Sequence, residues 1–101
     1  MLSFRQGGAG LSVSTAASNT TTALPADATG TVVRVANPST TLSIYVRLGI
    51  SSTTAAATDA AVPPMGVAFF DRSATDTHVC TFASGAGPTL VNIAVGEARF
   101  R

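Results

Sequence analysis

The sequence predicts an all-β protein, a single-domain antiparallel β-sandwich that is jelly-roll-like and carries an extended N-terminal segment. Apolar and other residues alternate with period two in several short runs, which is typical of half-buried strands. Turn residues separate these runs at short intervals, as in sandwiches and barrels. No run has the 3.6-residue apolar stripe of a helix. With 101 residues, the chain is expected to form one domain with one small core.

Residues 31–49 are predicted to form a β-hairpin. The run at 31–36 and the run at 42–48 both alternate aliphatic residues with others. Between them, residues 37–39 read Asn-Pro-Ser, which is typical of a turn. A hairpin would place both aliphatic rows on one face, so we expect that face to lie in the core.

The other face of this hairpin is the candidate interface. It carries Arg34, Tyr45 and Arg47, which the hairpin register would make neighbours across the two strands. Arg and Tyr are enriched in protein interfaces, so these three residues are predicted to contact a partner. The alternative is an ordinary solvated strand face.

The second half of the chain predicts three more strands. They are expected at 67–70, 77–82 and 89–95, and in the first of them two phenylalanines fall on opposite faces. Gly96 is expected to end the last strand, which leaves residues 97–101 as a short charged tail. Together with the hairpin, these runs give the five clearest strands of the sandwich.

A small-residue loop is predicted between the hairpin and the third strand. It covers residues 51–61, of which 56–61 could make one helical turn. The sequence Val-Pro-Pro at 62–64 restricts the backbone to extended or turn geometry and indicates the edge of a sheet.

Residues 1–30 are predicted to form an N-terminal arm with candidate edge strands, and residues 31–101 the β-sandwich domain. The candidate strands begin at Leu2 and at Leu11. Residues 14–22 are small, polar and low in complexity, so they cannot bury enough apolar area to order themselves. We expect this stretch to be either flexible or ordered by a neighbour.

The charge pattern argues against nucleic acid and the hydropathy against a membrane. The net charge is +1, there is no Lys, and the six Arg residues are scattered, whereas phosphate binding needs clustered basic side chains. No segment approaches the roughly 20 apolar residues of a membrane span. The N-terminus also lacks the apolar core of a signal peptide, so synthesis in a cytoplasm is expected.

The low charge content itself suggests partners. Charged residues make up 11% of the chain, less than half of the usual share of about 25%. One interpretation is that partners cover much of the surface. The other is a small surface of Thr and Ser that needs little charge.

No catalytic residue, metal site or cofactor site is predicted, so the chain is not expected to be an enzyme. His78 and Cys80 would share a strand face with Asp76, but zinc sites normally need three or four protein ligands. We therefore expect Cys80 to be a small buried apolar residue. The chain has a single His, and no nucleophile motif accompanies it, so nucleophilic catalysis is not predicted. Carboxylates such as Asp59 and Asp71 lie in predicted loops or turns, where Asp commonly bonds the local backbone.

Several segments resemble a recurring family of small β-sandwich virion proteins of tailed bacteriophages and prophages. Proteins of this family commonly serve as capsid decoration (cement) proteins or as related head and tail accessories. In this sequence Pro64-Met65-Gly66 stands where the family usually has Pro-Gly after Val-Pro, which leaves the turn type there open. The matching segments are distributed over residues 33–99, a span of about two thirds of the chain, and they are VRVANPST at 33–40, IYVRLG at 44–49, the loop through 58–59 into AVPPMG at 61–66, AFFD at 68–71, DTHV at 76–79 and VGEAR at 95–99.

The resemblance implies a structural role without an active site. The first expectation is a capsid decoration protein on the surface of a virion, made in a bacterial host cytoplasm. Its partners would be the major capsid protein and copies of itself, as a homo-oligomer. The second expectation is a tail, neck or head-fibre component. A carbohydrate-binding module is a further alternative, but such modules use exposed aromatic residues, and this chain has no Trp and one Tyr.

Overall fold

The computed structural model describes residues 2–8, 10–15, 19–25, 30–55, 59–73, 75–85 and 89–100. Within these ranges the chain forms nine strands, and it contains no helix of the length and hydropathy that crossing a membrane requires. The strands are β1 (Leu2–Gln6), β2 (Leu11–Thr15), β3 (Thr20–Ala23), β4 (Val32–Ala36), β5 (Ile44–Gly49), β6 (Ala60–Val62), β7 (Val67–Asp71), β8 (His78–Ala83) and β9 (Thr89–Phe100).

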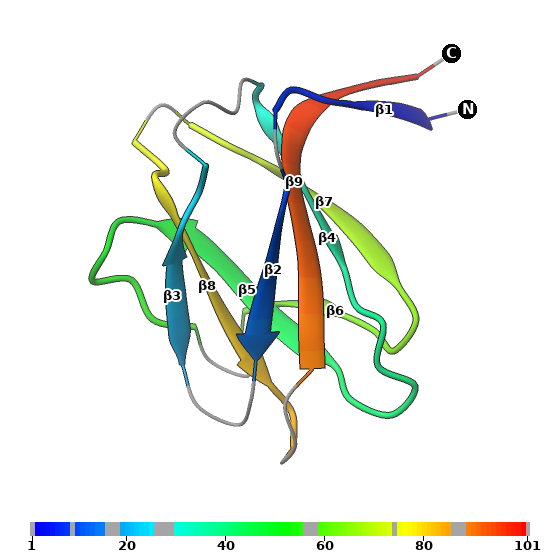
Figure 1. Cartoon of the computed structure of the whole chain (residues 1–101), viewed down its shortest axis with the longest axis vertical. Coiled ribbons are helices and arrows are strands. Elements are labelled where there is room, and N and C mark those ends of the chain that lie inside the picture. The colour runs from blue at the N-terminus through cyan, green and yellow to red at the C-terminus, as the bar shows by residue number, and fades with distance from the viewer. Residues whose placement is uncertain are drawn as a thin grey trace.

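The strands make two sheets that pack face to face (Figure 1). The five-stranded sheet has the order β1-β9-β4-β7, with β2 also paired to β9, and the four-stranded sheet has the order β3-β8-β5-β6. Every strand pair is antiparallel. The predicted all-β antiparallel sandwich is therefore confirmed.

The strands from β2 to β9 pair in a nested order. The pairs are β2 with β9, β3 with β8, β4 with β7, and β5 with β6. A long hairpin that is rolled up into two sheets would give this nested order. One consequence is that the chain changes sheet at most of its turns, so strands that are adjacent in sequence often lie in opposite sheets.

The core lies between the two sheets and consists of alternate side chains from both of them. Val33 and Val35 of β4 face Ile44 and Val46 of β5, and all four are buried. The two aliphatic rows predicted from the sequence are thus in the core. The other buried apolar members of this cluster are Val13, Leu24, Val62, Val79, Ala83, Val91, Ile93 and Val95.

The predicted hairpin at 31–49 is wrong, although both of its strands exist. β4 belongs to the five-stranded sheet and β5 to the four-stranded sheet, and the two strands do not pair. The Asn-Pro-Ser segment at 37–39 is a corner between the sheets. Its Asn37 is 2% exposed, and the side-chain amide nitrogen donates to the carbonyls of Leu42 at 2.7 Å and Val62 at 3.2 Å. These bonds hold the corner to chain segments of the other sheet.

Two other boundaries differ from the prediction. The last strand does not end at Gly96, because β9 continues to Phe100 and pairs there with β1. β6 occupies Ala60–Val62, so the described end of the possible helical turn at 56–61 is a strand. Residues 56–58 lie outside the described residues. Of the two expectations for residues 14–22, ordering by a neighbour holds where β3 forms, because β3 pairs with β8.

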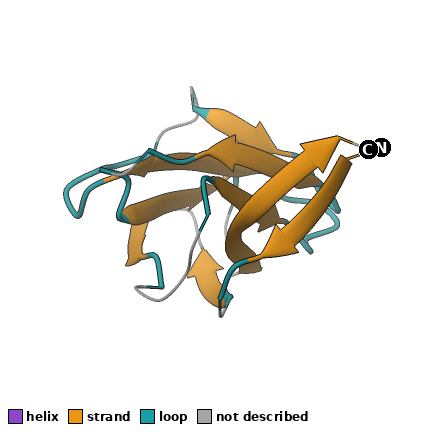
Figure 2. Cartoon of the chain, turned by 90° about the horizontal axis from the view of Figure 1, so that it is seen from above, coloured by secondary structure: helices purple, strands orange, loops and turns teal. Residues whose placement is uncertain are grey.

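The candidate edge strands of residues 1–30 are confirmed as β1 and β2. β2 pairs with residues 89–93 and β1 with residues 96–100, so the two strands lie end to end along the same side of β9. The ribbon made by β1 and the end of β9 bends away from the body of the sandwich (Figures 1 and 2). Gly96 lies at the bend, where it pairs with Gln6 of β1 and with Val32 of β4.

Candidate interaction surfaces

The three predicted interface residues lie on opposite sides of the molecule. Arg34 alternates with the buried Val33 and Val35, so it lies on the outer face of the five-stranded sheet. Tyr45 and Arg47 lie on the outer face of the four-stranded sheet by the same alternation. The prediction that the three are neighbours across a hairpin is therefore wrong. A contact role for each of them stays a prediction.

The outer face of the five-stranded sheet is rich in exposed apolar side chains. Leu90 is 64% exposed, Val67 54% and Phe69 38%. Val32 of β4 and Phe4 of β1 are half-buried and lie near Phe69. We call these five residues, Phe4, Val32, Val67, Phe69 and Leu90, the apolar face. Large side chains of this kind seldom gather outside a core unless something else contacts them.

Arg34 contacts Phe4 of the apolar face directly. Its Nη2 donates to Oδ1 of Asn92 on β9 at 3.0 Å, and its guanidinium carbon lies 5.4 Å from the ring centre of Phe4. The ring of Phe4 in turn lies 5.6 Å from that of Phe69 on β7. One side chain thus connects β1, β7 and β9 through contacts on the surface of β4. Nε of Arg34 is buried and has no hydrogen-bond partner among the described residues.

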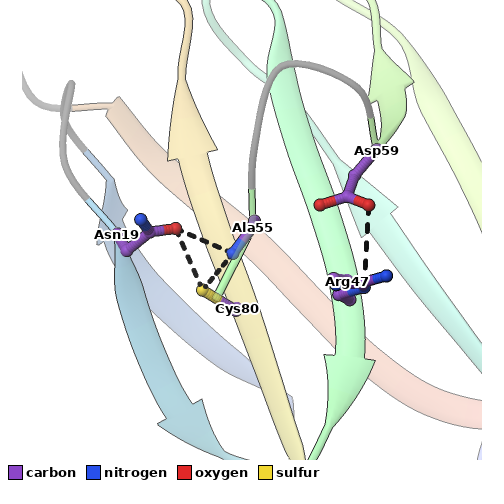
Figure 3. A network of polar contacts seen from close by, with 5 residues as sticks. All are labelled: Asn19, Arg47, Ala55, Asp59 and Cys80. Carbon is purple, nitrogen blue, oxygen red and sulfur yellow. Dashed lines mark hydrogen bonds and ion pairs between the residues drawn. The ribbon is translucent and has the colours of Figure 1, made fainter. Parts of the chain in front are cut away.

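The outer face of the four-stranded sheet is covered in part by the chain's own loop. The backbone N–H of Ala55 donates to Oδ1 of Asn19 at 2.8 Å and to Sγ of Cys80 at 3.2 Å (Figure 3). The Thr21 hydroxyl donates to the carbonyl of Thr53 at 2.8 Å. The loop is therefore tied to both β3 and β8, and Cys80 is fully buried beneath it.

The remaining part of this face carries the other two predicted residues. The rings of Tyr45 and Phe82 lie 6.0 Å apart across β5 and β8. Nε of Arg47 lies 3.6 Å from Oδ1 of Asp59 (Figure 3), and the Arg47 side chain is 59% exposed. An ion pair that long and that exposed contributes little to stability.

The residues weighed for metal binding have other contacts. Nδ1 of His78 shares a hydrogen bond with the Thr77 hydroxyl at 2.8 Å, and Oδ2 of Asp76 accepts from the N–H of Ser73 at 2.9 Å. Cys80 is buried, as predicted, beneath the loop. Within the described ranges, no three His, Cys, Asp or Glu side chains come together in a way that could hold a metal ion.

The comparisons with known proteins do not extend this description. No protein-family model matches the chain, and no match was found among curated proteins or solved structures.

Sequence reasoning missed the apolar face. One signal for it was the pair Phe69-Phe70, since adjacent aromatic residues in a strand must point to opposite sides of the sheet. Phe70 packs against the core, and Phe69 is therefore left on the outside. The contribution of Phe4 had no such signal, because it depends on how the terminal ribbon bends.

Proposed function

We propose that this chain is a non-catalytic structural protein of a tailed-bacteriophage virion. In this proposal it is a capsid decoration protein that binds the shell of major capsid protein, together with copies of itself. The observation that supports the proposal best is the apolar face, where Leu90 and Val67 are more than half exposed on a chain with 11% charged residues. The sequence resemblance to phage virion proteins supplies the choice of partner.

The physical argument is that a decoration protein works by burying surface. A stable protein interface covers roughly 1,200–2,000 Å² in total, with apolar side chains at its centre and a polar rim. The apolar face supplies such a centre, and Asn92 and the serines of β2 lie beside it on the same sheet. On a shell of identical subunits, many weak contacts of one kind act together.

The second candidate is a tail, neck or head-fibre component, which would use the same surface at a lower copy number. A carbohydrate-binding module belongs to a different class. It would rely on the half-buried Tyr45 and Phe82 pair on the opposite side of the sandwich. Glycan-array binding by a protein that is absent from particles would favour that module over both virion proposals.

Purified virions test the proposal directly. Mass spectrometry and electron microscopy should find the chain in many copies on the head shell, and a few copies at the tail would exclude the decoration role. On undecorated capsids, Leu90→Lys should lower occupancy several-fold because it places a charge on the apolar face. The matched control is Ala61→Lys, which adds the same charge to an exposed site on the other sheet. Equal losses for both variants would place the contact elsewhere.

A further inference from the structure

The five-stranded sheet has one edge at β7 and the other at β1 and β2, which among the described residues pair with β9 alone. Among the described residues β7 pairs with β4 alone, so one side of its backbone has no strand beside it. Its sequence, VAFFD, contains no Pro or Lys, the residues that commonly block an edge strand. An unprotected edge of this kind is a template for another strand.

The hydrogen-bond pattern shows which backbone groups point outward. The N–H of Asn37 donates to the carbonyl of Gly66, and the N–H of Arg72 donates to the carbonyl of Thr31. Bonding pairs alternate along an antiparallel ladder, so Ala68 and Phe70 also bond toward β4. The N–H and C=O groups of the alternate residues Val67, Phe69 and Asp71 therefore point away from the sheet.

The edges of the other sheet differ from β7 in ways that discourage pairing. β6 has three residues and is followed directly by Pro63 and Pro64, which have no N–H to donate. β3 consists of three threonines and an alanine, and its Thr21 side chain is bonded to the loop at Thr53. Of these three edge strands, β7 is the one with large apolar side chains and no blocking residue.

We propose that two copies of this chain pair through β7, antiparallel, about a two-fold axis at Phe69. In this register Phe69 lies opposite Phe69 of the second copy, and Val67 lies opposite Asp71 of the second copy. The outward backbone groups then bond reciprocally, and the two five-stranded sheets become one. The proposal deepens the proposed function, on which it rests for the idea that copies associate.

Self-complementarity is the reason for choosing a second copy as the occupant. The pairing places no like charges opposite each other, because Asp71 meets Val67 and Arg72 meets Gly66. It also brings two apolar faces together on the same side of the joined sheet. Phe4, which lies 5.6 Å from Phe69 within each copy, would make a four-ring cluster about the axis.

Two substitutions at Val67 test the register. Val67 is 54% exposed, so neither Val67→Glu nor Val67→Lys disturbs the core. Glu would lie opposite Asp71 of the second copy and repel it, whereas Lys would attract it. The two-fold axis makes each cross-strand pair occur twice in the dimer. We therefore expect the dimer Kd of Val67→Glu to be about tenfold higher than that of Val67→Lys, and this ratio should be smaller at high salt.

The measurement is sedimentation equilibrium of the isolated full chain, with thermal melts to confirm that each variant folds. The wild-type protein should reach twice its chain mass of 10.1 kDa. Leu90→Glu is the control, because it changes an exposed apolar residue on β9, two strands away from the edge. It should leave the Kd within about twofold of the wild-type value. A chain that stays monomeric, equal Kd values for the two Val67 variants, or an equal loss in Leu90→Glu would overturn the proposal.

A second measurement does not depend on charge. In the proposed register the two Phe69 Cα atoms would lie about 5.5 Å apart, within disulfide range. Phe69→Cys should therefore form a covalent dimer with oxidised glutathione, while Leu90→Cys should not, and the native Cys80 is buried. Failure of Phe69→Cys to crosslink would exclude this register. Because both tests use the isolated chain, their failure is distinguishable from absence of the protein from virions.

Discussion

The two outer faces of the sandwich differ in how the chain's own residues cover them. The four-stranded sheet is covered in part by the chain itself, since the N–H of Ala55 donates to Asn19 and to Cys80, and Cys80 is fully buried (Figure 3). On the five-stranded sheet Val67, Phe69 and Leu90 stay exposed, and Arg34 bonds Asn92 and lies over the ring of Phe4. A face that its own chain covers has less surface to offer, and for this reason our proposal places the partner contact on the five-stranded side.

Two arginines make the same contrast at the level of single residues. Arg34 is half-buried, bonds to Asn92 and lies over the ring of Phe4. Arg47 is mostly exposed and makes one long contact with Asp59. The same residue type is therefore part of the packing on one face and a peripheral charge on the other.

The largest effect is expected at Gly96, where the terminal ribbon leaves the five-stranded sheet. A Cβ at this position would overlap the backbone carbonyl of Arg5 on β1. Backbone cannot move aside as a flexible side chain can, so Gly96→Ala should separate β1 from β9. We expect the free energy of unfolding in urea to fall by about 2–3 kcal/mol, the upper range for overpacking.

Gly10→Ala is the control for this change. A Cβ there would lie 3.2 Å from the carbonyl of Ile93, a tight contact that a small shift can relieve. We expect a loss of about 1 kcal/mol or less. If Gly96→Ala proved as stable as Gly10→Ala, the close approach of β1 to β9 would be wrong, and the support of the apolar face by Phe4 would fall with it.

A smaller effect is expected for Arg34→Ala. The change removes the hydrogen bond to Asn92 and the contact with the Phe4 ring, and it also removes a buried Nε that has no partner in the described part of the chain. The losses outweigh the relief, so unfolding in urea should show a net loss of about 1–2 kcal/mol. Hydrogen exchange should also quicken at Gly7, whose N–H donates to the carbonyl of Val95 beside the ribbon.

Arg34→Lys separates packing from charge. Lysine keeps the positive charge but lacks the planar group that both bonds Asn92 and stacks on Phe4. We expect it to recover less than half of the lost stability. Full recovery by Lys would mean that charge alone matters at this position, and Arg34 would then be no more structural than Arg47.

The sequence predicted the strands of this protein better than their partners. Period-two alternation in β4 and β5 identified the buried side chains, because burial of alternate residues is a local property of a strand. It could not tell which sheet each strand joins. The change of sheet between them is accompanied by contacts distant in sequence, such as the bond from the Asn37 amide to the carbonyl of Val62, 25 residues away. No local pattern reports such a bond, and the Asn-Pro-Ser segment therefore read as a hairpin turn.

The predicted grouping of the three interface residues is wrong for the same physical reason, namely that a local pattern does not tell which strands pair. Arg34, Tyr45 and Arg47 were correctly placed outside the core, but grouping them required the hairpin that does not form. The prediction ended the last strand at Gly96 because Gly usually weakens a strand. Here the strand continues through Gly96, and Gly fits at this position because the close approach of the Arg5 carbonyl leaves no room for a side chain.

The smallest effect is expected for Arg47→Ala on the four-stranded face. Its 3.6 Å contact with Asp59 is exposed, so the free energy of unfolding should change by less than about 0.5 kcal/mol. Asp59→Ala should cost more, because the Asp59 side chain is 17% exposed and has further contacts. Urea unfolding of both variants, measured beside Arg34→Ala, compares the two faces on one scale. A loss at Arg47 equal to that at Arg34 would mean that both faces depend equally on their arginines, and the case for the apolar face as the partner side would lose its structural basis.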